Sequence, residues 1–226
     1  MRLLRFKIDL STNAEKITFN MPQICSISTG KVRVINSDQE NPHQEIRSAI
    51  IKSPMSALSE PNPVMAHHLG IDGDEQANLK VHGGIEKAIY AYPLEHYAFW
   101  KDCLVKENRL HLGQELQHGS FGENLTTEGF VEAEVYIGDI WQIDKTVMQV
   151  TEFREPCFKF NIKMNYSGAA KIMVQSGYSG WYLKVIEPGM IMAGSQIKVK
   201  PGPRKLSIAS QSLNFYQRTG QQSLEI

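Results

Sequence analysis

The chain has 226 residues, which is long enough for one large domain to bury a hydrophobic core. Lysine and arginine together number 24, and aspartate and glutamate also number 24, so the formal net charge is zero. With no overall positive charge, the protein is not expected to bind nucleic acid or an acidic membrane surface, and any basic site has to be local.

The first half of the chain contains short runs of apolar and β-branched residues. These runs predict three strands, at residues 23–35, 46–52 and 87–92. The first strand is expected to break near Gly30, because glycine interrupts such patterns. Pro93 is suited to the first turn of a helix, and apolar residues at helical spacing predict a structural helix over residues 94–105.

The second half of the chain is also rich in short apolar runs. These predict four more strands, at residues 135–143, 147–153, 180–187 and 196–200, and Gly138 and Asp139 suggest a turn or bulge within the first of them. The first two of them follow each other closely and are predicted to pair as a hairpin. Helical patterns predict a short helix over residues 168–175 and one helix within residues 204–226. Because short strands outnumber helices, the sequence predicts a mainly β fold of the α+β class, a closed or nearly closed β-barrel with helices packed outside it.

The sequence around Cys157 favours a role as a nucleophile or a metal ligand. The strand before it meets Pro156, which cannot donate a ladder hydrogen bond, so the strand is expected to end beside Glu155. Cys157 then follows a strand end, with Arg154 and Lys159 on either side of it in the sequence. A cation folded back onto the sulfur favours the thiolate, which is both a nucleophile and a metal ligand. The alternative is a small buried apolar residue.

The cysteines also bear on the compartment of the protein. Cys25, Cys103 and Cys157 are an odd number and far apart, which favours a reducing compartment over a disulfide framework. The N-terminus interrupts its apolar residues with charges and offers no signal-peptide core, and no apolar run is long enough to span a bilayer. The sequence therefore predicts a cytoplasmic protein without a membrane segment.

Several familiar motifs are missing or incomplete. The sequence has no Gly-x-x-x-x-Gly-Lys phosphate loop, no His-Glu-x-x-His zinc motif and no Cys-x-x-Cys. The carboxylates of residues 72–75 lack the further ligands of a calcium loop, which favours a solvated turn. Residues 119–122 resemble a nucleophile elbow around Ser120, but His118 replaces the first glycine and no strand leads into it. A serine hydrolase is therefore disfavoured.

A second candidate site surrounds His82. Gly83 and Gly84 follow it, and two glycines let backbone amides approach an anionic or planar ligand. Lys80 and Lys87 bring positive charge from either side. Taken alone, the signal is weak, because such a histidine is more often a hydrogen-bonded structural residue and exposed lysines are usually solvated.

In combination, these motifs resemble the MOSC family, the domain named for the C-terminal part of molybdenum cofactor sulfurases. The motifs that carry the resemblance are Asp74, residues 80–84, Lys87, residues 122–126 and residues 154–157. The resemblance is closest to the YiiM-type bacterial members, the 6-N-hydroxylaminopurine resistance proteins. The division it implies is an N-terminal extension over residues 1–29, a MOSC β-barrel domain over residues 30–200, and a C-terminal tail with one helix over residues 201–226.

The resemblance implies a barrel that binds the molybdenum cofactor, with Cys157 as the catalytic residue and the protein ligand to the metal. A soft thiolate suits molybdenum that is already held by the dithiolene sulfurs of the pterin. The residues implied to contact the cofactor are Asp74, Lys80, His82, Gly83, Gly84, Lys87, Glu123, Asn124, Thr126 and Arg154. For Asp74 and Glu123, a role in orienting a basic neighbour is the alternative.

The function that the resemblance implies is the reduction of N-hydroxylated small molecules, such as hydroxylaminopurines or amidoximes, for detoxification. Because the sequence shows no flavin or iron–sulfur pattern, a separate reductase is expected to donate the electrons. Two alternatives stay open: a sulfur carrier with a persulfide on Cys157, and a protein that binds the cofactor without turnover. The chain departs from YiiM-type proteins, which usually end in three helices, because only residues 204–226 follow the barrel. An oligomer is compatible with the sequence.

Overall fold

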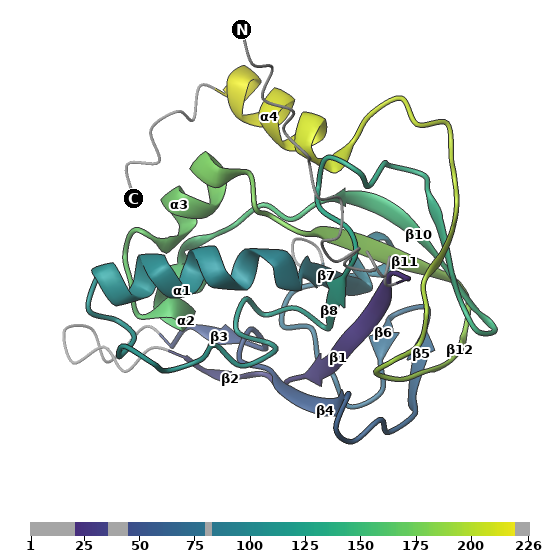
Figure 1. The fold of residues 1–226 in the computed structure, drawn as a ribbon, viewed down its shortest axis with the longest axis horizontal. Helices are drawn as coiled ribbons and strands as arrows, with labels where there is room; N and C mark the ends of the chain where they lie inside the picture. Colours follow the sequence, from purple (N-terminus) through teal and green to yellow (C-terminus); the bar gives the residue numbers. More distant parts are fainter. Residues whose placement is uncertain (1–20, 36–44, 80–82, 220–226) are drawn as a thin grey trace, which may run out of the picture.

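The computed structural model describes residues 21–35, 45–79 and 83–219 (Figure 1). Its largest element is an eight-stranded sheet with the strand order β13-β9-β10-β11-β7-β8-β1-β4. The strands are β1 Gln23–Thr29, β4 Ser53–Ala57, β7 Ile89–Pro93, β8 Leu125–Glu128, β9 Ile140–Ile143, β10 Thr146–Phe153, β11 Trp181–Glu187 and β13 Lys198–Lys200. Neighbours are antiparallel except β7 and β8, which run parallel. The sheet curls into a half-barrel, which confirms the predicted mainly β, α+β fold.

Two smaller sheets complete the β structure. One has the order β12-β5-β6, and the other pairs β2 with β3. Their strands are β2 Arg33–Val34, β3 Arg47–Ser48, β5 Val64–His67, β6 Gly70–Ile71 and β12 Gly189–Ile191. The β2–β3 pair lies beneath helix α2 in Figure 1.

The hairpin of β9 and β10 shows how the side-chain pattern builds the core. Along β10, buried and half-buried residues alternate with the period of two that a strand requires. Its buried Met148 joins the main hydrophobic cluster, in which the rings of Trp141 and Trp181 meet edge to face with centroids 5.7 Å apart. Because β9 and β10 pair in antiparallel register, the predicted hairpin is confirmed.

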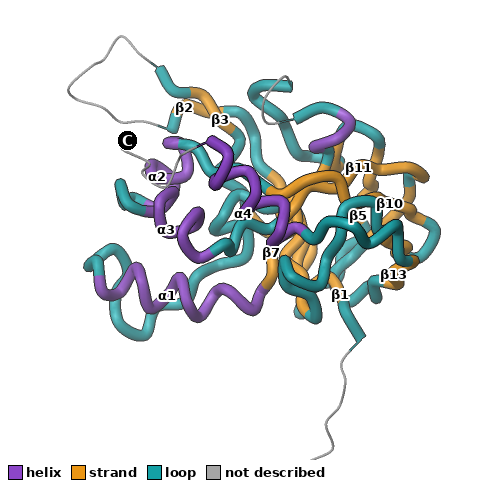
Figure 2. The backbone as a smooth tube through the Cα atoms, turned by 90° about the horizontal axis from the view of Figure 1, so that it is seen from above, coloured by secondary structure: helices purple, strands orange, loops and turns teal. Residues whose placement is uncertain are grey.

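The helices gather on one side of the molecule together with β2 and β3, and the other labelled strands lie on the opposite side (Figure 2). The α-helices are α1 Tyr97–Lys106, α2 Phe158–Met164, α3 Ala169–Ser176 and α4 Ile208–Thr219, and the 3-10 turns are η1 Ile85–Lys87 and η2 Leu94–His96. A second cluster packs α1 against β7: Trp100 donates to the Tyr92 hydroxyl at 2.7 Å, and Phe121 stacks on the Tyr92 ring. In the described part of the chain, no helix combines the length and apolar composition that a membrane span needs.

Some predicted elements differ from the structure. The predicted strand over residues 135–143 begins only at Ile140, because Asp139 turns the chain and accepts a hydrogen bond from the Gly202 amide at 2.8 Å. The predicted strand over residues 46–52 is reduced to the two residues of β3. Helix α2 was not predicted, because a helix of seven residues depends on packing, here of the buried Phe160 and Met164, more than on its own propensity.

Strand β1 lies within the segment predicted to be an N-terminal extension. It nevertheless sits between β8 and β4 in the main sheet, and six of its seven residues are buried. The fold therefore uses residues before position 30. Residues 1–20 lie outside the described part, and the division into residues 1–29, 30–200 and 201–226 stays a prediction.

Candidate functional site

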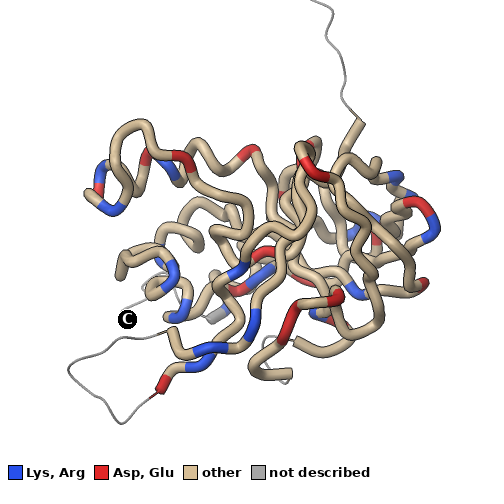
Figure 3. The backbone as a smooth tube through the Cα atoms, turned by 90° about the horizontal axis from the view of Figure 1, so that it is seen from below, with Lys and Arg blue, Asp and Glu red and all other residues tan. Residues whose placement is uncertain are grey.

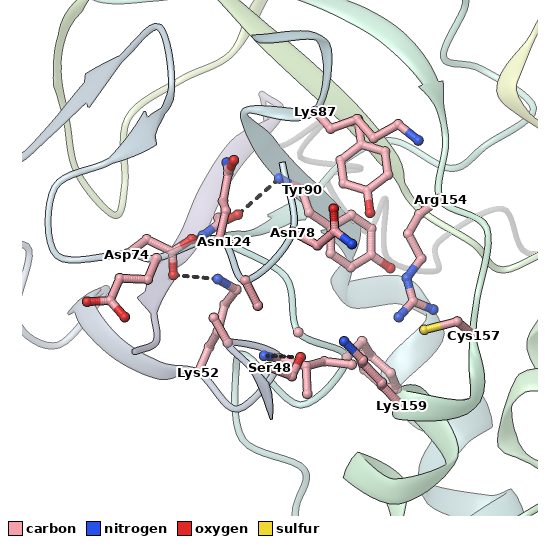
Figure 4. Close-up of a pocket in the computed structure, with 18 of the residues that line it drawn as sticks. Ser48, Lys52, Asp74, Asn78, Lys87, Tyr90, Asn124, Arg154, Cys157 and Lys159 are labelled. Atoms are coloured by element: carbon pink, nitrogen blue, oxygen red, sulfur yellow. Dashed lines mark hydrogen bonds and ion pairs between the residues drawn. The ribbon is translucent and has the colours of Figure 1, made fainter. Parts of the chain in front are cut away.

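Cys157 lies where the chain passes from β10 into α2. β10 ends at Phe153, just before the expected end beside Glu155, and Cys157 is the N-cap residue of α2. The cysteine is thus placed just past a strand end, as the sequence predicted. Its side chain is half-buried and makes no cap hydrogen bond. The sulfur is therefore available to a pocket that opens beside it (Figure 4).

This pocket, which we call the Cys157 pocket, is lined by segments that are far apart in the sequence. Its volume is about 710 Å³, including the part open to solvent. It brings together five of the predicted site residues: Asp74, Lys87, Asn124, Arg154 and Cys157. Lining residues that the sequence did not single out as a site include Lys52, Tyr90 and Tyr182.

Arg154 places a buried cation in the Cys157 pocket. The residue is 6% exposed, and its guanidinium lies 5.6 Å from the ring centre of Tyr90 and 4.8 Å from that of Phe160. Burial acts to lower the pKa of Arg154, but the hydroxyls of Tyr90 and Tyr182, negative when ionised, raise it on balance. Among the described residues no carboxylate forms an ion pair with it. Figure 4 shows the guanidinium directed at the sulfur of Cys157.

Lys159, the second cation predicted to flank Cys157, lines the same pocket. Its Nζ donates a hydrogen bond of 3.0 Å to the backbone oxygen of Arg47, which ties α2 to β3. The structure therefore places both flanking cations on the side of the pocket that carries the cysteine.

Asp74 and Lys52 form a buried ion pair on the other side of the pocket (Figure 4). The Nζ–Oδ1 distance is 2.5 Å, and the side chains are 7% and 5% exposed for Lys52 and Asp74. Asp74 also accepts hydrogen bonds of 2.8 Å from the Gly30 amide and from the Asn124 side chain. Burial lowers the pKa of Lys52, and the Asp74 carboxylate opposes that shift. The interpretation of residues 72–75 as a solvated turn is therefore wrong for Asp74.

Asn124 connects this ion pair to the strands of the barrel. Its Oδ1 accepts a hydrogen bond of 3.1 Å from the Tyr90 amide, and its Nδ2 donates to the Ser28 oxygen at 3.2 Å as well as to Asp74. Both the oxygen and the nitrogen of the Asn124 side chain are thus hydrogen-bonded within the protein. Asn124 therefore fixes the pocket wall, and its predicted contact with a heterocycle stays a prediction.

Glu123 and Thr126 lie behind the pocket wall and are fully buried. The Glu123 carboxylate accepts hydrogen bonds from the Gly119 amide at 2.7 Å, the Phe121 amide at 2.9 Å and the Thr126 hydroxyl at 3.0 Å. The hydroxyl of Tyr97 is a further donor to it. The geometry favours the alternative in which Glu123 is an orienting group, although it orients backbone amides where a basic neighbour was expected.

Lys87 lies at the edge of the pocket. Its Nζ is 3.3 Å from a Glu152 carboxylate oxygen and 5.5 Å from the centre of the Tyr182 ring. Lys80 and His82 lie outside the described residues, so their predicted roles stay predictions.

Gly83 and Gly84 are described, but they do not belong to the pocket lining. The Gly84 amide donates a hydrogen bond of 2.8 Å to the side-chain oxygen of Gln76, which does line the pocket. Gly84 thus holds a side chain of the wall, and the predicted contact of the two glycines with a cofactor stays a prediction.

Lys52 was missed because its partner is distant in the sequence. A lysine at the end of an apolar run is usually a solvated strand end, and nothing local marks it as buried. Its burial depends on Asp74, which a separate turn brings to it. Tyr90 and Tyr182 were missed for a related reason, because tyrosines in strands are ordinary core residues until their hydroxyls reach a cavity.

Gly122 provides a test of how tightly the wall is packed. Its φ is 82°, and a Cβ added there would lie 2.7 Å from Cγ1 of Ile50. We expect Gly122→Ala to lower the free energy of unfolding by about 2–4 kcal/mol, because backbone strain and a steric clash add. Gly113→Ala is the matched control, since φ is 88° but no atom lies within 4 Å. Urea unfolding of both variants measures the difference; equal losses would show that the contact with Ile50 relaxes freely.

Comparison with known proteins agrees with this architecture. The chain is 34% identical to the uncharacterized protein YflK of Bacillus subtilis over 176 residues, which cover 78% of this chain and 72% of YflK. It is 36% identical to protein YiiM of Escherichia coli over 147 residues, which cover 65% of this chain and 63% of YiiM. A protein named reductase from Gibberella moniliformis is 34% identical over 160 residues, 70% of this chain but only 27% of that reductase.

The fold and a family model lead to the same assignment. The crystal structure of YiiM from Geobacillus stearothermophilus has a TM-score of 0.66 and 30% sequence identity, with 87% of this chain and 85% of that chain covered. The MOSC domain model matches residues 78–198, more than half of the chain. The chain therefore belongs to the MOSC domain family, as the sequence motifs indicated.

Proposed function

We propose that this protein binds the molybdenum cofactor in the Cys157 pocket and reduces N-hydroxylated small molecules to the amine or amidine. The observation that carries the proposal is the meeting of the Cys157 sulfur with the buried Arg154 guanidinium in a pocket open to solvent. Membership of the MOSC family and the relative named reductase support it.

The metal-ligating side chains of the pocket fit a cofactor that itself supplies most of the ligands to its metal. In the described part of the chain, no three His, Cys, Asp or Glu side chains are placed to hold a metal ion together. A metal in the pocket would thus take a single soft ligand, Cys157, from this part of the protein, and thiolate ligands suit a metal already held by sulfur. A bare metal ion is a poorer match.

The charges of the pocket fit an anionic cofactor. Arg154 and Lys159 line it, and Arg154 has no acidic partner among the described residues, whereas the charge of Lys52 is already compensated by Asp74. A buried cation without a counter-charge is costly, so an anionic ligand stabilises it. We propose that Arg154 and Lys159 neutralise the cofactor phosphate and the sulfur anions, with Lys87 at the edge.

In this proposal, the residues of the chain hold the cofactor and keep the walls of the pocket in place. Cys157 would hold the metal from the N-terminus of α2, and Arg154 would compensate the charge of the bound thiolate from inside the aromatic cluster. Asp74 and Asn124 keep the opposite wall rigid, and Glu123 and Thr126 fix the loop behind it. When bound, the cofactor supplies two electrons that, with two protons, convert an N–OH group into N–H and water.

The electrons are proposed to come from a separate reductase. The match covers 27% of the Gibberella protein named reductase, so most of that relative lies outside the matched region.

The three cysteines Cys25, Cys103 and Cys157 are all free thiols, which supports the proposal of a cytoplasmic location.

The test is cofactor content followed by turnover. Protein from a molybdate-fed host that makes the cofactor is expected to carry equimolar molybdenum and pterin, measured by elemental analysis and pterin fluorescence. It should then reduce 6-N-hydroxylaminopurine with dithionite-reduced methyl viologen. Bound cofactor without turnover would support the non-catalytic alternative. A persulfide on Cys157 without molybdenum would support the sulfur carrier, and both outcomes would overturn the proposal.

A further inference from the structure

Two tyrosines line the Cys157 pocket side by side. Tyr90 on β7 pairs in register with Tyr182 on β11, and the centres of their rings lie 5.5 Å apart. Both residues are buried, with exposed fractions of 5% and 8%. A phenol hydroxyl can donate one hydrogen bond and accept others, so the role of each tyrosine depends on where its proton is directed.

The two hydroxyls differ in how the protein uses them. The Tyr90 hydroxyl donates a hydrogen bond of 2.8 Å to the backbone oxygen of Ser179, so its proton is held within the protein. The Tyr182 hydroxyl instead forms its hydrogen bond with the Arg154 guanidinium, and no described residue accepts its proton. A guanidinium only donates, so the Tyr182 oxygen is the acceptor in that bond. The proton of Tyr182 is therefore left for a molecule bound in the pocket.

Tyr182 is also the tyrosine that is closer in its electrostatics to Cys157. Burial raises the pKa of Tyr182 to about 12, the positive charge of Arg154 opposes this shift, and an ionised Cys157 adds to it. For Tyr90, whose pKa is raised mainly by burial, Cys157 is not among the groups that contribute. The Tyr182 hydroxyl thus keeps its proton at neutral pH on the side of the pocket that carries the cysteine.

The cations of the pocket are less suited to give up a proton. Lys52 is held in its buried ion pair, and the Nζ of Lys159 donates to a backbone oxygen of β3. The guanidinium of Arg154 does not lose a proton at neutral pH. Among these described lining groups, Tyr182 combines a removable proton with a place beside Cys157.

Tyr182 also adjoins the solvent-exposed edge of the pocket. Its register partner on β10 is Glu152, whose carboxylate lies 3.3 Å from the Nζ of Lys87, and that Nζ lies 5.5 Å from the centre of the Tyr182 ring. The side chains of Lys87 and Glu152 are 28% and 35% exposed. Charges of both signs are interspersed along the chain in Figure 3, so near neighbours, more than a broad surface field, act on Tyr182. A proton lost from the hydroxyl can thus be replaced from solvent at this edge.

We propose that Tyr182 is a catalytic residue that gives its proton to the oxygen of the N-hydroxyl group as the N–O bond breaks. The inference rests on the proposed function, because it names the residue that completes that reduction. Two electrons come from the cofactor, one proton passes from Tyr182 to the departing oxygen, and one proton from solvent goes to the nitrogen. The products are the amine and water. The hydrogen bond from Arg154 stabilises the phenolate until solvent returns its proton.

The first experiment compares Tyr182→Phe with a matched loss of another buried hydroxyl. With 6-N-hydroxylaminopurine and dithionite-reduced methyl viologen, loaded Tyr182→Phe should lose about 100-fold in kcat, with KM little changed and molybdenum and pterin still equimolar. The control is Tyr92→Phe, since that hydroxyl lies between Trp100 and the Tyr178 oxygen, outside the pocket lining, and it should retain kcat. Full kcat in Tyr182→Phe, or a loss explained by missing cofactor, would overturn the inference.

A difluorotyrosine at position 182 separates proton donation from a structural role. It keeps the ring and the hydroxyl, but the fluorines lower the pKa of the hydroxyl. The rate should be rescued at low pH and should fall as pH rises through the lowered pKa, because the phenolate has no proton to give. Wild type should show no such fall in the same range. An unchanged pH profile would mean that the hydroxyl does not donate its proton in the reaction.

Fluorine NMR of the same loaded variant provides a readout that needs no turnover. Adenine, the product of 6-N-hydroxylaminopurine reduction, should shift the resonance at position 182 and leave the same label at Tyr92 unchanged. A resonance at 182 that ignores adenine would overturn the contact between Tyr182 and the bound molecule. A loaded wild-type protein that does not reduce the substrate would overturn the proposed function. An active wild type with an equally active Tyr182→Phe would overturn only the role of Tyr182.

Discussion

Replacing Cys157 with alanine is expected to remove bound molybdenum and to lower N-hydroxyl reduction by at least about 100-fold. The thiol is the candidate protein ligand in the pocket, and no group of described side chains is placed to hold the metal in its stead. The free energy of unfolding should change by less than about 1 kcal/mol, because the side chain is half-buried and makes no cap hydrogen bond. Elemental analysis, viologen-driven turnover and a urea melt measure the three quantities.

A matched cysteine separates the ligand role from a general effect of losing a thiol. Cys103 is also free and half-buried, but it lies on α1 and does not line the pocket. Cys103→Ala should therefore keep its molybdenum and its activity. If Cys157→Ala retained both as well, the sulfur of Cys157 would not be a ligand and the proposed site would be wrong.

The second large effect is expected on stability, from Asp74→Asn. The substitution keeps the shape of the side chain but leaves the buried Lys52 ammonium without its carboxylate. We expect the free energy of unfolding to fall by about 3 kcal/mol at pH 7, the usual result of breaking a buried ion pair from one side. Asp72→Asn is the matched control, because that side chain is 67% exposed, and it should cost less than about 0.5 kcal/mol.

The loss in Asp74→Asn should depend on pH in a defined direction. Burial already lowers the folded-state pKa of Lys52 below its value of 10.5, and removing Asp74 takes away the largest opposing effect. The unfolded chain then binds the proton more tightly than the folded one. Stability of the variant relative to wild type therefore recovers as pH rises from the lowered pKa toward that of the unfolded lysine.

Chemical denaturation at pH 7 and at alkaline pH tests this direction. The difference between wild type and Asp74→Asn should shrink at the higher pH. A difference that stayed constant or grew would show that the Lys52 ammonium is not the origin of the loss, and that the amide contacts to Gly30 and Asn124 are. The control Asp72→Asn should show no such pH dependence.

The sequence by itself determined the class of the fold and the place of the cysteine. Period-two runs at residues 147–153 and 180–187 were enough to identify β10 and β11, because alternation in a strand is a local property. Pro156 was enough to end β10 before Cys157, since a proline cannot donate to the ladder. The glycine and cysteine motifs were enough to indicate the family.

Only the tertiary structure decided which charges share a site. Lys52 and Asp74 look like solvated residues in separate segments, and their burial follows from the way β4 and the turn at Asp74 meet beside β1. Side-chain periodicity records which face of an element is buried, but contacts between distant segments depend on the closure of the sheet, which no local pattern encodes.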